Sequence, residues 1–289
     1  MGRRDAGRFF PGAEPRIAED DVDAAFAAAW NFFDLPMQEK ERVRRRPGSN
    51  AGWEYRAQVR PSTGTPDNKE SYQITMSDME NGWPDESELP GFEARMRRFE
   101  RQNWELGMKI LSCFAIKLGF DADFFTHNHD PASPHYQSTL RLIHYMSMEN
   151  ATDADFEFWR AGAHSDFDCL TLLHQRPGQG GLQVCPGKDA DNPAWTDVPP
   201  VRGAVTCNIG DMLMRWSDDR LRSTCTGCAC PGGMNIWGHG CRCRFSVRPT
   251  ATPSFRGHKR NTIPSPRRII WMSGSTPITR PGRKGRTHA

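Results

Sequence analysis

A histidine and an aspartate two positions apart are the residues whose types and spacing could do chemistry. His164 and Asp166 stand just before a run of strand-forming residues, Cys-Leu-Thr-Leu-Leu. On an extended strand, residues i and i+2 project from one face, so an imidazole and a carboxylate can converge on one point. Such a pair supplies two of the three ligands of a 2-His-1-carboxylate Fe(II) site, which leaves open positions for O₂ and a co-substrate. Taken alone, the tripeptide favours a surface loop with a hydrogen-bonded histidine, since such tripeptides occur by chance in many chains.

A second candidate site is the cysteine-rich segment near the C-terminus. Five of the nine cysteines lie between Cys225 and Cys243, with His239 among them. Four thiolate or imidazole side chains can form a closed tetrahedral zinc site. The spacing Cys225-x2-Cys228-x-Cys230 differs from the paired C-x2-C knuckles of structural zinc sites. A zinc-binding protein without oxygenase activity is therefore the alternative hypothesis.

The other cysteines and the composition indicate a globular intracellular protein. Hydrophobic residues make up 37% and charged residues 25% of the 289 residues, which is ordinary for a globular chain. No apolar run reaches membrane-spanning length, and no charged-then-apolar leader opens the chain. We therefore expect a cytoplasmic monomer with no membrane partner. Buried, reduced thiols are expected at the four cysteines in apolar surroundings, Cys113, Cys169, Cys185 and Cys207.

The acidic residues stop abruptly along the chain. Asp219 is the last of the 35 Asp and Glu residues, whereas 14 of the 38 Lys and Arg residues fall in residues 220–289. The net charge of +3 thus conceals an acidic part followed by a basic one. A basic tail can bind nucleic acid, but this requires motif or aromatic support, and Trp271 stands alone among the arginines. We expect no nucleic-acid partner.

The elements that must position these residues are helices first and short strands afterwards. Apolar residues recur at helical spacing over residues 19–43, where Pro36 opens a second helical segment. Residues 89–119 form a long amphipathic helix pattern that ends at Gly119. This order predicts a sandwich or barrel of strands braced by helices. The strand-type runs cover residues 138–148, 168–175, 180–186, 194–200 and 203–217.

Several motifs occur in a fixed order around the His-x-Asp pair. They are Leu-Thr-Leu-Leu (170–173), Gly-Leu-Gln-Val (181–184), Val-Pro-Pro (198–200), Asn-x-Gly-Asp (208–211) and Ser-Thr (223–224). Over residues 20–224 the chain closely resembles the 2-oxoglutarate/Fe(II)-dependent dioxygenases of the isopenicillin N synthase-like superfamily. The resemblance implies an α+β fold, with a double-stranded β-helix (jelly roll) core and a helical N-terminal region.

The same resemblance implies the site and its cofactors. It assigns His164 and Asp166 as catalytic metal ligands for Fe(II), Tyr145 as a contact of 2-oxoglutarate, and Arg244 as the arginine for its distal carboxylate. The Arg244-Phe245-Ser246 triplet matches the family's Arg-x-Ser pair, displaced by several residues. The implied reaction uses O₂ to hydroxylate, desaturate or cyclise a small organic substrate, and family habit suggests secondary metabolism.

Other residues near the motifs are expected to be structural. Asp168 is interpreted as lying beside the ligands or exposed. Phe167, Leu172 and Trp216 are interpreted as core or pocket-wall residues, and His144 and His174 as structural histidines.

The third ligand of the family pattern is missing. After Thr224 the family has x-His-Arg-Val, whereas this chain has Cys-Thr-Gly-Cys, so the histidine is expected near Cys225 and Thr226. One added base after the Thr224 codon lets the same nucleotides read Leu-His-Arg-Val. We therefore hypothesise a frameshift at Thr224 and Cys225, which also explains the acid-free tail and the burst of cysteines. From this hypothesis we expect that the polypeptide with this sequence has impaired oxygenase activity, because it lacks the third metal ligand.

This hypothesis divides the chain into four parts. An irregular N-terminus (1–18) precedes a helical dioxygenase region (19–130) and a partial jelly-roll core (131–224). Residues 225–289 form a basic tail that is expected to be non-native or disordered. The core should then lack the strand that closes the jelly roll, which leaves an open sheet edge.

Overall fold

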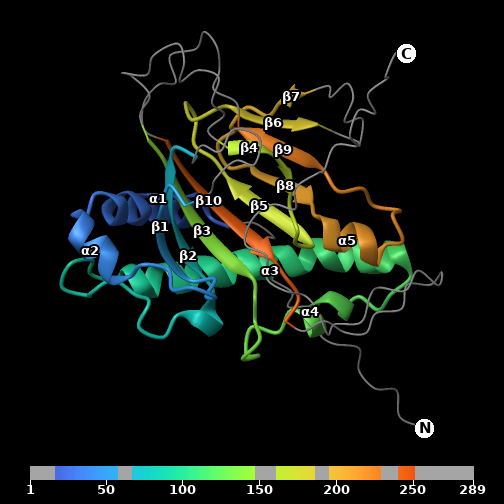
Figure 1. Cartoon of the computed structure of the whole chain (residues 1–289). Coiled ribbons are helices and arrows are strands. Elements are labelled where there is room, and N and C mark those ends of the chain that lie inside the picture. The colour runs from blue at the N-terminus through green and yellow to red at the C-terminus, as the bar shows by residue number, and fades with distance from the viewer. Residues whose placement is uncertain (1–16, 58–66, 147–160, 186–194, 229–239, 251–289) are drawn as a thin grey trace, which may run out of the picture.

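The computed structural model describes residues 17–57, 67–146, 161–185, 195–228 and 240–250, and Figure 1 shows their arrangement. Two antiparallel sheets are braced by helices along one side. The helices are α1 (Glu19–Phe33), α2 (Met37–Arg42), η1 (Met76–Asp78), α3 (Phe92–Leu118), α4 (Phe124–Asn128) and α5 (Asp211–Trp216). The strands are β1 (Gly52–Tyr55), β2 (Lys69–Ile74), β3 (Thr139–Tyr145), β4 (Ala161–Ser165), β5 (Leu170–His174), β6 (Leu182–Cys185), β7 (Thr196–Asp197), β8 (Val205–Ile209), β9 (Cys225–Cys228) and β10 (Gly240–Val247).

The two long helical patterns are confirmed. Residues 19–43 form α1 and α2, separated at Pro36, whose missing N–H is tolerated where a helix begins. The long amphipathic pattern forms α3, which ends at Gly119 with a left-handed φ of 87°. A glycine adopts this conformation without the steric cost of a Cβ, so it closes the helix.

The strands form a jelly roll, as the resemblance implied. The six-stranded sheet has the order β1-β2-β3-β10-β5-β8, and the four-stranded sheet has the order β4-β9-β6-β7. From β3 onward the chain passes repeatedly between the two sheets, and every described strand pair is antiparallel. The two sheets therefore share one interior, which lies between them (Figure 1).

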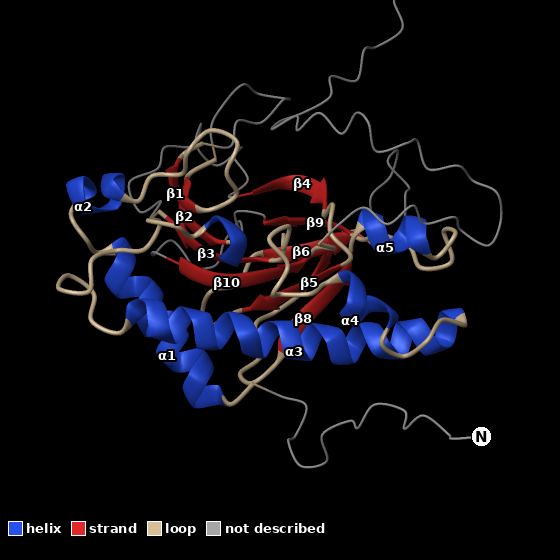
Figure 2. Cartoon of the chain, turned by 90° about the horizontal axis from the view of Figure 1, so that it is seen from below, coloured by secondary structure: helices blue, strands red, loops and turns tan. Residues whose placement is uncertain are grey.

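Helices α1 and α3 cover the outer face of the six-stranded sheet (Figure 2). The strands alternate in polarity across this sheet. Leu140, Leu142, Leu172, Phe245 and Val247 face the helices, and each is fully buried. At Gly107 the helix approaches closely, since an added Cβ would lie 3.0 Å from Val247. This apolar layer is the core that fixes the sheet.

The opposite face of the same sheet is polar and lies toward the interior. In the ladder, Arg244 of β10 pairs with Arg141 of β3, and Ser246 pairs with Thr171 of β5. Thr171 in turn pairs with Asn208 of β8. Because side chains alternate along a strand, these residues share the face that the helices leave uncovered. The fold thus places charged and hydroxyl groups between the sheets.

The cysteine-rich segment contributes two strands, which differs from the expected loss of the closing strand. β9 lies between β4 and β6, and β10 lies between β3 and β5. The jelly-roll core therefore extends beyond residue 224. The physical reason is alternation: Cys243, Phe245 and Val247 are fully buried, while the residues between them are polar. A segment with this alternation of apolar and polar residues can form a central strand, even if a frameshift produced the segment. Residues 251–289 lie outside the described residues.

Other sequence interpretations have mixed outcomes. The run 203–217 contains β8, but its second half is helix α5 instead of strand. Leu172 and Trp216 are buried as expected, whereas Phe167 is 62% exposed, because it lies in a turn beyond β4. Of the four scattered cysteines, Cys169 and Cys185 are buried, but Cys113 and Cys207 are exposed.

The two histidines interpreted as structural pack against helices. His144 lies against the rings of Trp30 and Phe33 and hydrogen-bonds to Glu70 at 2.8 Å. His174 is buried and is joined to Asn103 of α3 at 2.8 Å. Among the described helices, none combines the length and the apolar composition needed to cross a lipid bilayer.

Candidate active site

His164 and Asp166 come together at the end of β4. Nε2 of His164 lies 3.6 Å from Oδ1 of Asp166, so the two side chains converge as the i, i+2 spacing predicted. The histidine side chain is 47% exposed, whereas the aspartate is 4% exposed. One partner is therefore accessible from outside while the other is anchored in the interior.

Three donors from the other sheet fix the Asp166 carboxylate. Oδ2 accepts hydrogen bonds from Thr171 at 2.7 Å and from the Asn208 amide at 2.9 Å. Oδ1 accepts from the guanidinium of Arg244 at 2.5 Å. Asp168 is fully buried beside this group and also accepts from Thr171, which rules out the exposed alternative for it.

The backbone of the segment that carries Asp166 is held by the start of α5. The N–H of Asp211 donates to the Asp166 carbonyl at 2.7 Å, and the N–H of Met212 donates to the Asp168 carbonyl at 3.2 Å. Gly210 allows this approach, because an added Cβ would lie 2.6 Å from Asp168 Oδ1 and 2.8 Å from the Asp166 carbonyl. The Asn-x-Gly-Asp motif was visible in the sequence, but its positioning role became apparent only in three dimensions.

The buried charges set the pKa values of this group. Burial would raise the pKa of Asp166, but Arg244, the Asn208 amide and His164 lower it, and it lies below the ordinary value. For Asp168, burial raises the pKa and the charge of Asp166 adds to the rise against the opposing Arg244. Burial would lower the pKa of Arg244, yet the two carboxylates raise it. Asp166 therefore carries the negative charge that faces the guanidinium.

Tyr145 and Arg244, which the resemblance assigned to 2-oxoglutarate, lie on the same inner face. Tyr145 is buried at the end of β3, and Arg244 is the ladder partner of Arg141 on that strand. Arg141 donates to Glu54 at 2.6 Å, and Glu54 also accepts from Ser71 at 3.0 Å. The inner face thus combines cationic and carboxylate groups, and Arg244 already pairs with Asp166.

Thr226 occupies the place where the third ligand was expected. In the β4–β9 ladder it is the direct partner of His164, and its side chain is buried. Across the described part of the chain, no three His, Cys, Asp or Glu side chains are arranged to hold a metal ion. The residues present therefore supply two of the three ligands of a facial triad and do not fit the complete site.

The zinc alternative gains no support from the described residues. Cys225 lies on β9 of the four-stranded sheet, whereas Cys243 lies on β10 of the six-stranded sheet and is fully buried. Neither thiol is part of a disulfide bond. The two ends of the cysteine segment therefore belong to different layers of the fold. Cys230 and His239 lie outside the described residues.

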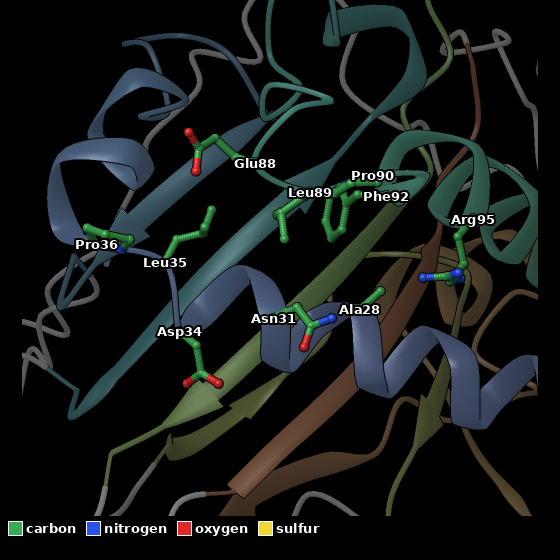
Figure 3. Close-up of a pocket in the computed structure, with 10 residues that line it drawn as sticks. All are labelled: Ala28, Asn31, Asp34, Leu35, Pro36, Glu88, Leu89, Pro90, Phe92 and Arg95. Atoms are coloured by element: carbon green, nitrogen blue, oxygen red, sulfur yellow. The ribbon is translucent and has the colours of Figure 1, made fainter.

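A separate surface pocket of about 360 Å³ lies at the end of α1 (Figure 3). Its walls come from the α1–α2 connection, including Asp34 and Leu35, and from the turn before α3, including Glu88 and Leu89. None of the residues around Asp166 contributes to it, so it is distinct from the candidate active site.

A jelly roll that carries a His-x-Asp pair at the end of strand β4, at the edge of the four-stranded sheet, is the arrangement of the 2-oxoglutarate/Fe(II)-dependent dioxygenases. The family model described as "2OG-Fe(II) oxygenase superfamily" matches residues 136–231. The model described as "non-haem dioxygenase in morphine synthesis N-terminal" matches residues 9–89.

Named relatives agree with these models. The 2-oxoglutarate-dependent dioxygenase htyE of Aspergillus rugulosus is 32% identical, over 76% of this chain and 70% of its own. A full-length Neurospora crassa protein, whose crystal structure is a complex with alpha-KG and thymine, is 30% identical with a TM-score of 0.70. That match covers 81% of this chain and 73% of the Neurospora chain. The chain therefore belongs to the 2-oxoglutarate/Fe(II)-dependent dioxygenase family.

The match does not span whole relatives. The 2-oxoglutarate-Fe(II) type oxidoreductase hxnY of Emericella nidulans is 32% identical over 74% of this chain, but only 64% of hxnY is covered. The chain thus spans less than two thirds of the length of that relative.

Proposed function

We propose that this protein is an Fe(II)- and 2-oxoglutarate-dependent oxygenase that oxidises a small organic substrate with O₂, and that its activity is impaired in the present chain. The observation that carries the proposal is the 3.6 Å approach of His164 to Asp166 at the end of β4, where the aspartate is buried and the histidine is half exposed. Bound iron and 2-oxoglutarate would supply the oxidising power, and His164 and Asp166 would be two of the metal ligands.

The residues of the chain would contribute binding and orientation. Thr171 and Asn208 hold one oxygen of Asp166 and leave Oδ1 turned toward His164. Tyr145 and Arg244 lie on the inner face, where a dicarboxylate could meet a hydroxyl and a guanidinium. Asp166 engages Arg244 through Nη2, whereas Nε of Arg244 is buried without a hydrogen-bond partner, so the guanidinium keeps donors that a dicarboxylate could use.

The substrate class is proposed from the relatives. One of them is named a proline hydroxylase, buaE of Petromyces alliaceus, at 32% identity, and the Neurospora crassa protein was crystallised with thymine. A small polar metabolite, of the kind found in secondary metabolism, is the substrate that these names suggest for this chain. Loops and pocket shape select the substrate, so the fold does not choose among hydroxylation, desaturation and ring closure.

Location and assembly are also proposed. A cytoplasmic location is supported by the described cysteines, none of which forms a disulfide bond, since reduced thiols are typical of that compartment. A monomer with no nucleic-acid or membrane partner is proposed as well, and in support of the monomer the large exposed hydrophobic side chains come from separate segments of the chain. Among the described residues these are Met37, Tyr55, Ile116, Phe167 and Val201.

The test is succinate formation from 2-oxoglutarate by the purified full chain under air with added Fe(II). We expect slow turnover that disappears in both His164→Ala and Asp166→Asn. Turnover equal in the parent chain and in both variants would exclude this site, and tightly bound zinc in the purified protein would favour the alternative function.

A further inference from the structure

Two cysteines stand directly opposite each other in the four-stranded sheet. Strand β9 lies between β4 and β6 (Figure 1), and in the β6–β9 ladder Cys185 is the partner of Cys225. Directly opposed residues of an antiparallel pair have Cα atoms about 4.5–5.5 Å apart, and their side chains rise from one face of the sheet. A disulfide bond spans Cα separations of about 4.4–6.8 Å. The register therefore brings these two thiols within bonding range.

The same strand excludes the pairing that the sequence spacing suggests. Cys225 and Cys228 form a C-x2-C motif, the spacing of many redox-active dithiols. Both residues lie on β9, where three steps along an extended strand separate their Cα atoms by about 10 Å, too far for a disulfide bond. In the ladders Cys228 is opposed by Ala161 and Leu182, neither of which carries a thiol. Within the described sheet, the strand partner of Cys225 that carries a thiol is therefore Cys185.

The two thiols differ in their access to solvent. Both are free, but Cys185 is only 5% exposed whereas Cys225 is partly exposed. An oxidant from solution therefore meets Cys225 first, and Cys185 lies beside it as the second nucleophile. Burial raises the pKa of the Cys225 thiol, and the neighbouring Cys185 and Asp211 raise it further. Because the thiolate is the reacting species, we expect exchange to be slow at neutral pH and faster in alkaline solution.

We propose that Cys185 and Cys225 form a redox-sensitive dithiol, which a low-molecular-weight disulfide such as oxidised glutathione converts into a disulfide bond between β6 and β9. The thiolate of Cys225 attacks one glutathione sulfur and releases one molecule of reduced glutathione. The thiolate of Cys185 then attacks the Cys225 sulfur of the mixed disulfide and releases the second molecule. Two protein thiols are oxidised, one glutathione disulfide is reduced, and the two protons end on the released glutathione thiols.

The bond would close the segment that holds Asp166 in place. Residues 186–224 lie between the two cysteines and include β8 and α5. From this segment the Asn208 amide donates to the Asp166 carboxylate at 2.9 Å, and the N–H of Asp211 donates to the Asp166 carbonyl at 2.7 Å. Closing a loop of this length restricts the unfolded chain, so oxidation should stabilise the fold.

The bond should also be reversible. The Cβ atoms of opposed residues lie about 4.5–5.5 Å apart, whereas a relaxed disulfide needs about 3.8 Å, so β6 and β9 must move together to form it. A strained disulfide is reduced more easily than a relaxed one. Neither thiol is a proposed metal ligand, so the reaction goes beyond the proposed function and does not depend on iron. With an additional base after the Thr224 codon, leucine would replace Cys225, so the dithiol is a property of the present polypeptide.

The experiment oxidises the reduced full chain with oxidised glutathione at about pH 8.5, in dilute solution that suppresses bonds between molecules. The remaining thiols are then blocked, the protein is digested without a reducing agent, and mass spectrometry identifies the linked peptides. We expect a peptide pair joined through Cys185 and Cys225, and a Tm higher by about 5 °C than that of the reduced chain. Dithiothreitol should abolish both.

Two variants and a matched control locate the effect. Cys225→Ser and Cys185→Ala must each abolish the linked peptides and the rise in Tm, whereas Cys207→Ser, which removes an exposed thiol of β8, should retain both. Oxidation of the parent chain tests the bond even if one of these variants fails to fold. A dominant link from Cys225 to Cys228, Cys230 or any other cysteine overturns the inference. So does a Cys225 that keeps its glutathione, or stays a free thiol, after prolonged oxidation.

Discussion

The guanidinium of Arg244 lies 2.5 Å from Oδ1 of Asp166, although the two residues belong to opposite sides of the jelly roll. Arg244 lies on β10 of the six-stranded sheet, and Asp166 directly follows β4 of the four-stranded sheet. With Asp168 they form a buried ion group that ties the two sheets together. The group stabilises the site and, by the same contact, occupies the oxygen that a metal would need.

Removing the arginine tests this dual role. Arg244→Leu leaves two carboxyl groups buried without their cation, so we expect a loss of about 3–5 kcal/mol in the free energy of unfolding. Urea denaturation measures it. The control is Arg42→Leu, which removes an exposed partner of Glu39 and should cost less than about 0.5 kcal/mol. Equal effects of the two changes would contradict the importance of the buried group.

The close approach at Gly210 gives a second prediction. In Gly210→Ala the new methyl group collides with backbone and side-chain oxygens of Asp168, and we expect a loss of about 2 kcal/mol or more in stability. Gly82→Ala is the matched control, because its Cβ would lie 3.5 Å from the flexible end of Met79. Thermal unfolding of both variants measures the difference, and a neutral Gly210→Ala would show that the α5 turn does not constrain the site.

A buried carboxyl group on α3 predicts a pH dependence of stability. Burial raises the pKa of Glu100 from 4.5 to about 7, although the Tyr136 hydroxyl donates to it at 2.6 Å. The folded state then holds the proton more tightly than the unfolded state, so this contribution to stability is present at low pH and is lost as pH rises from about 4.5 to 7. Relative to Glu100→Gln, the parent chain should lose up to about 3 kcal/mol between about pH 4.5 and 8. Parallel stability curves for the two proteins would refute it.

The closing strand can be tested through its central aromatic side chain. Phe245 is fully buried on β10, so Phe245→Ala should destabilise the fold by about 3–5 kcal/mol through lost burial and a cavity. Phe167→Ala removes the same ring from an exposed position and should change stability by less than about 0.5 kcal/mol. If both variants were neutral in urea denaturation, β10 would not be part of the core.

The proposed frameshift makes a prediction about nucleic acid sequence. The genomic DNA and the transcript are sequenced across codons 215–245. We expect one additional base after the Thr224 codon, with which residues 225–228 read Leu-His-Arg-Val. Independent reads of both molecules measure this. If the reading frame of this gene is verified and closely related genes also lack the extra base, the frameshift proposal is wrong. Thr226 would then be an evolved residue.

The sequence by itself determined the features that depend on short-range pattern. The helical periods of residues 19–43 and 89–119 predicted α1, α2 and α3, because a helix buries one face through neighbours three and four positions apart. The His164-x-Asp166 spacing predicted convergence of the two side chains, since alternation along a strand is local. Of the two interpretations of Phe167, a core position is wrong, because this residue lies in a bend after β4 where the alternation of a strand does not hold.

Only the tertiary structure decided which distant groups meet. Thr226 faces His164 across 62 positions of the chain, and Arg244 reaches Asp166 across 78. The basic tail was expected to leave the jelly roll open, yet its residues 240–247 fill the central place between β3 and β5. The physical reason is that strand register and sheet order are set by packing against the whole core, which no short stretch of sequence contains.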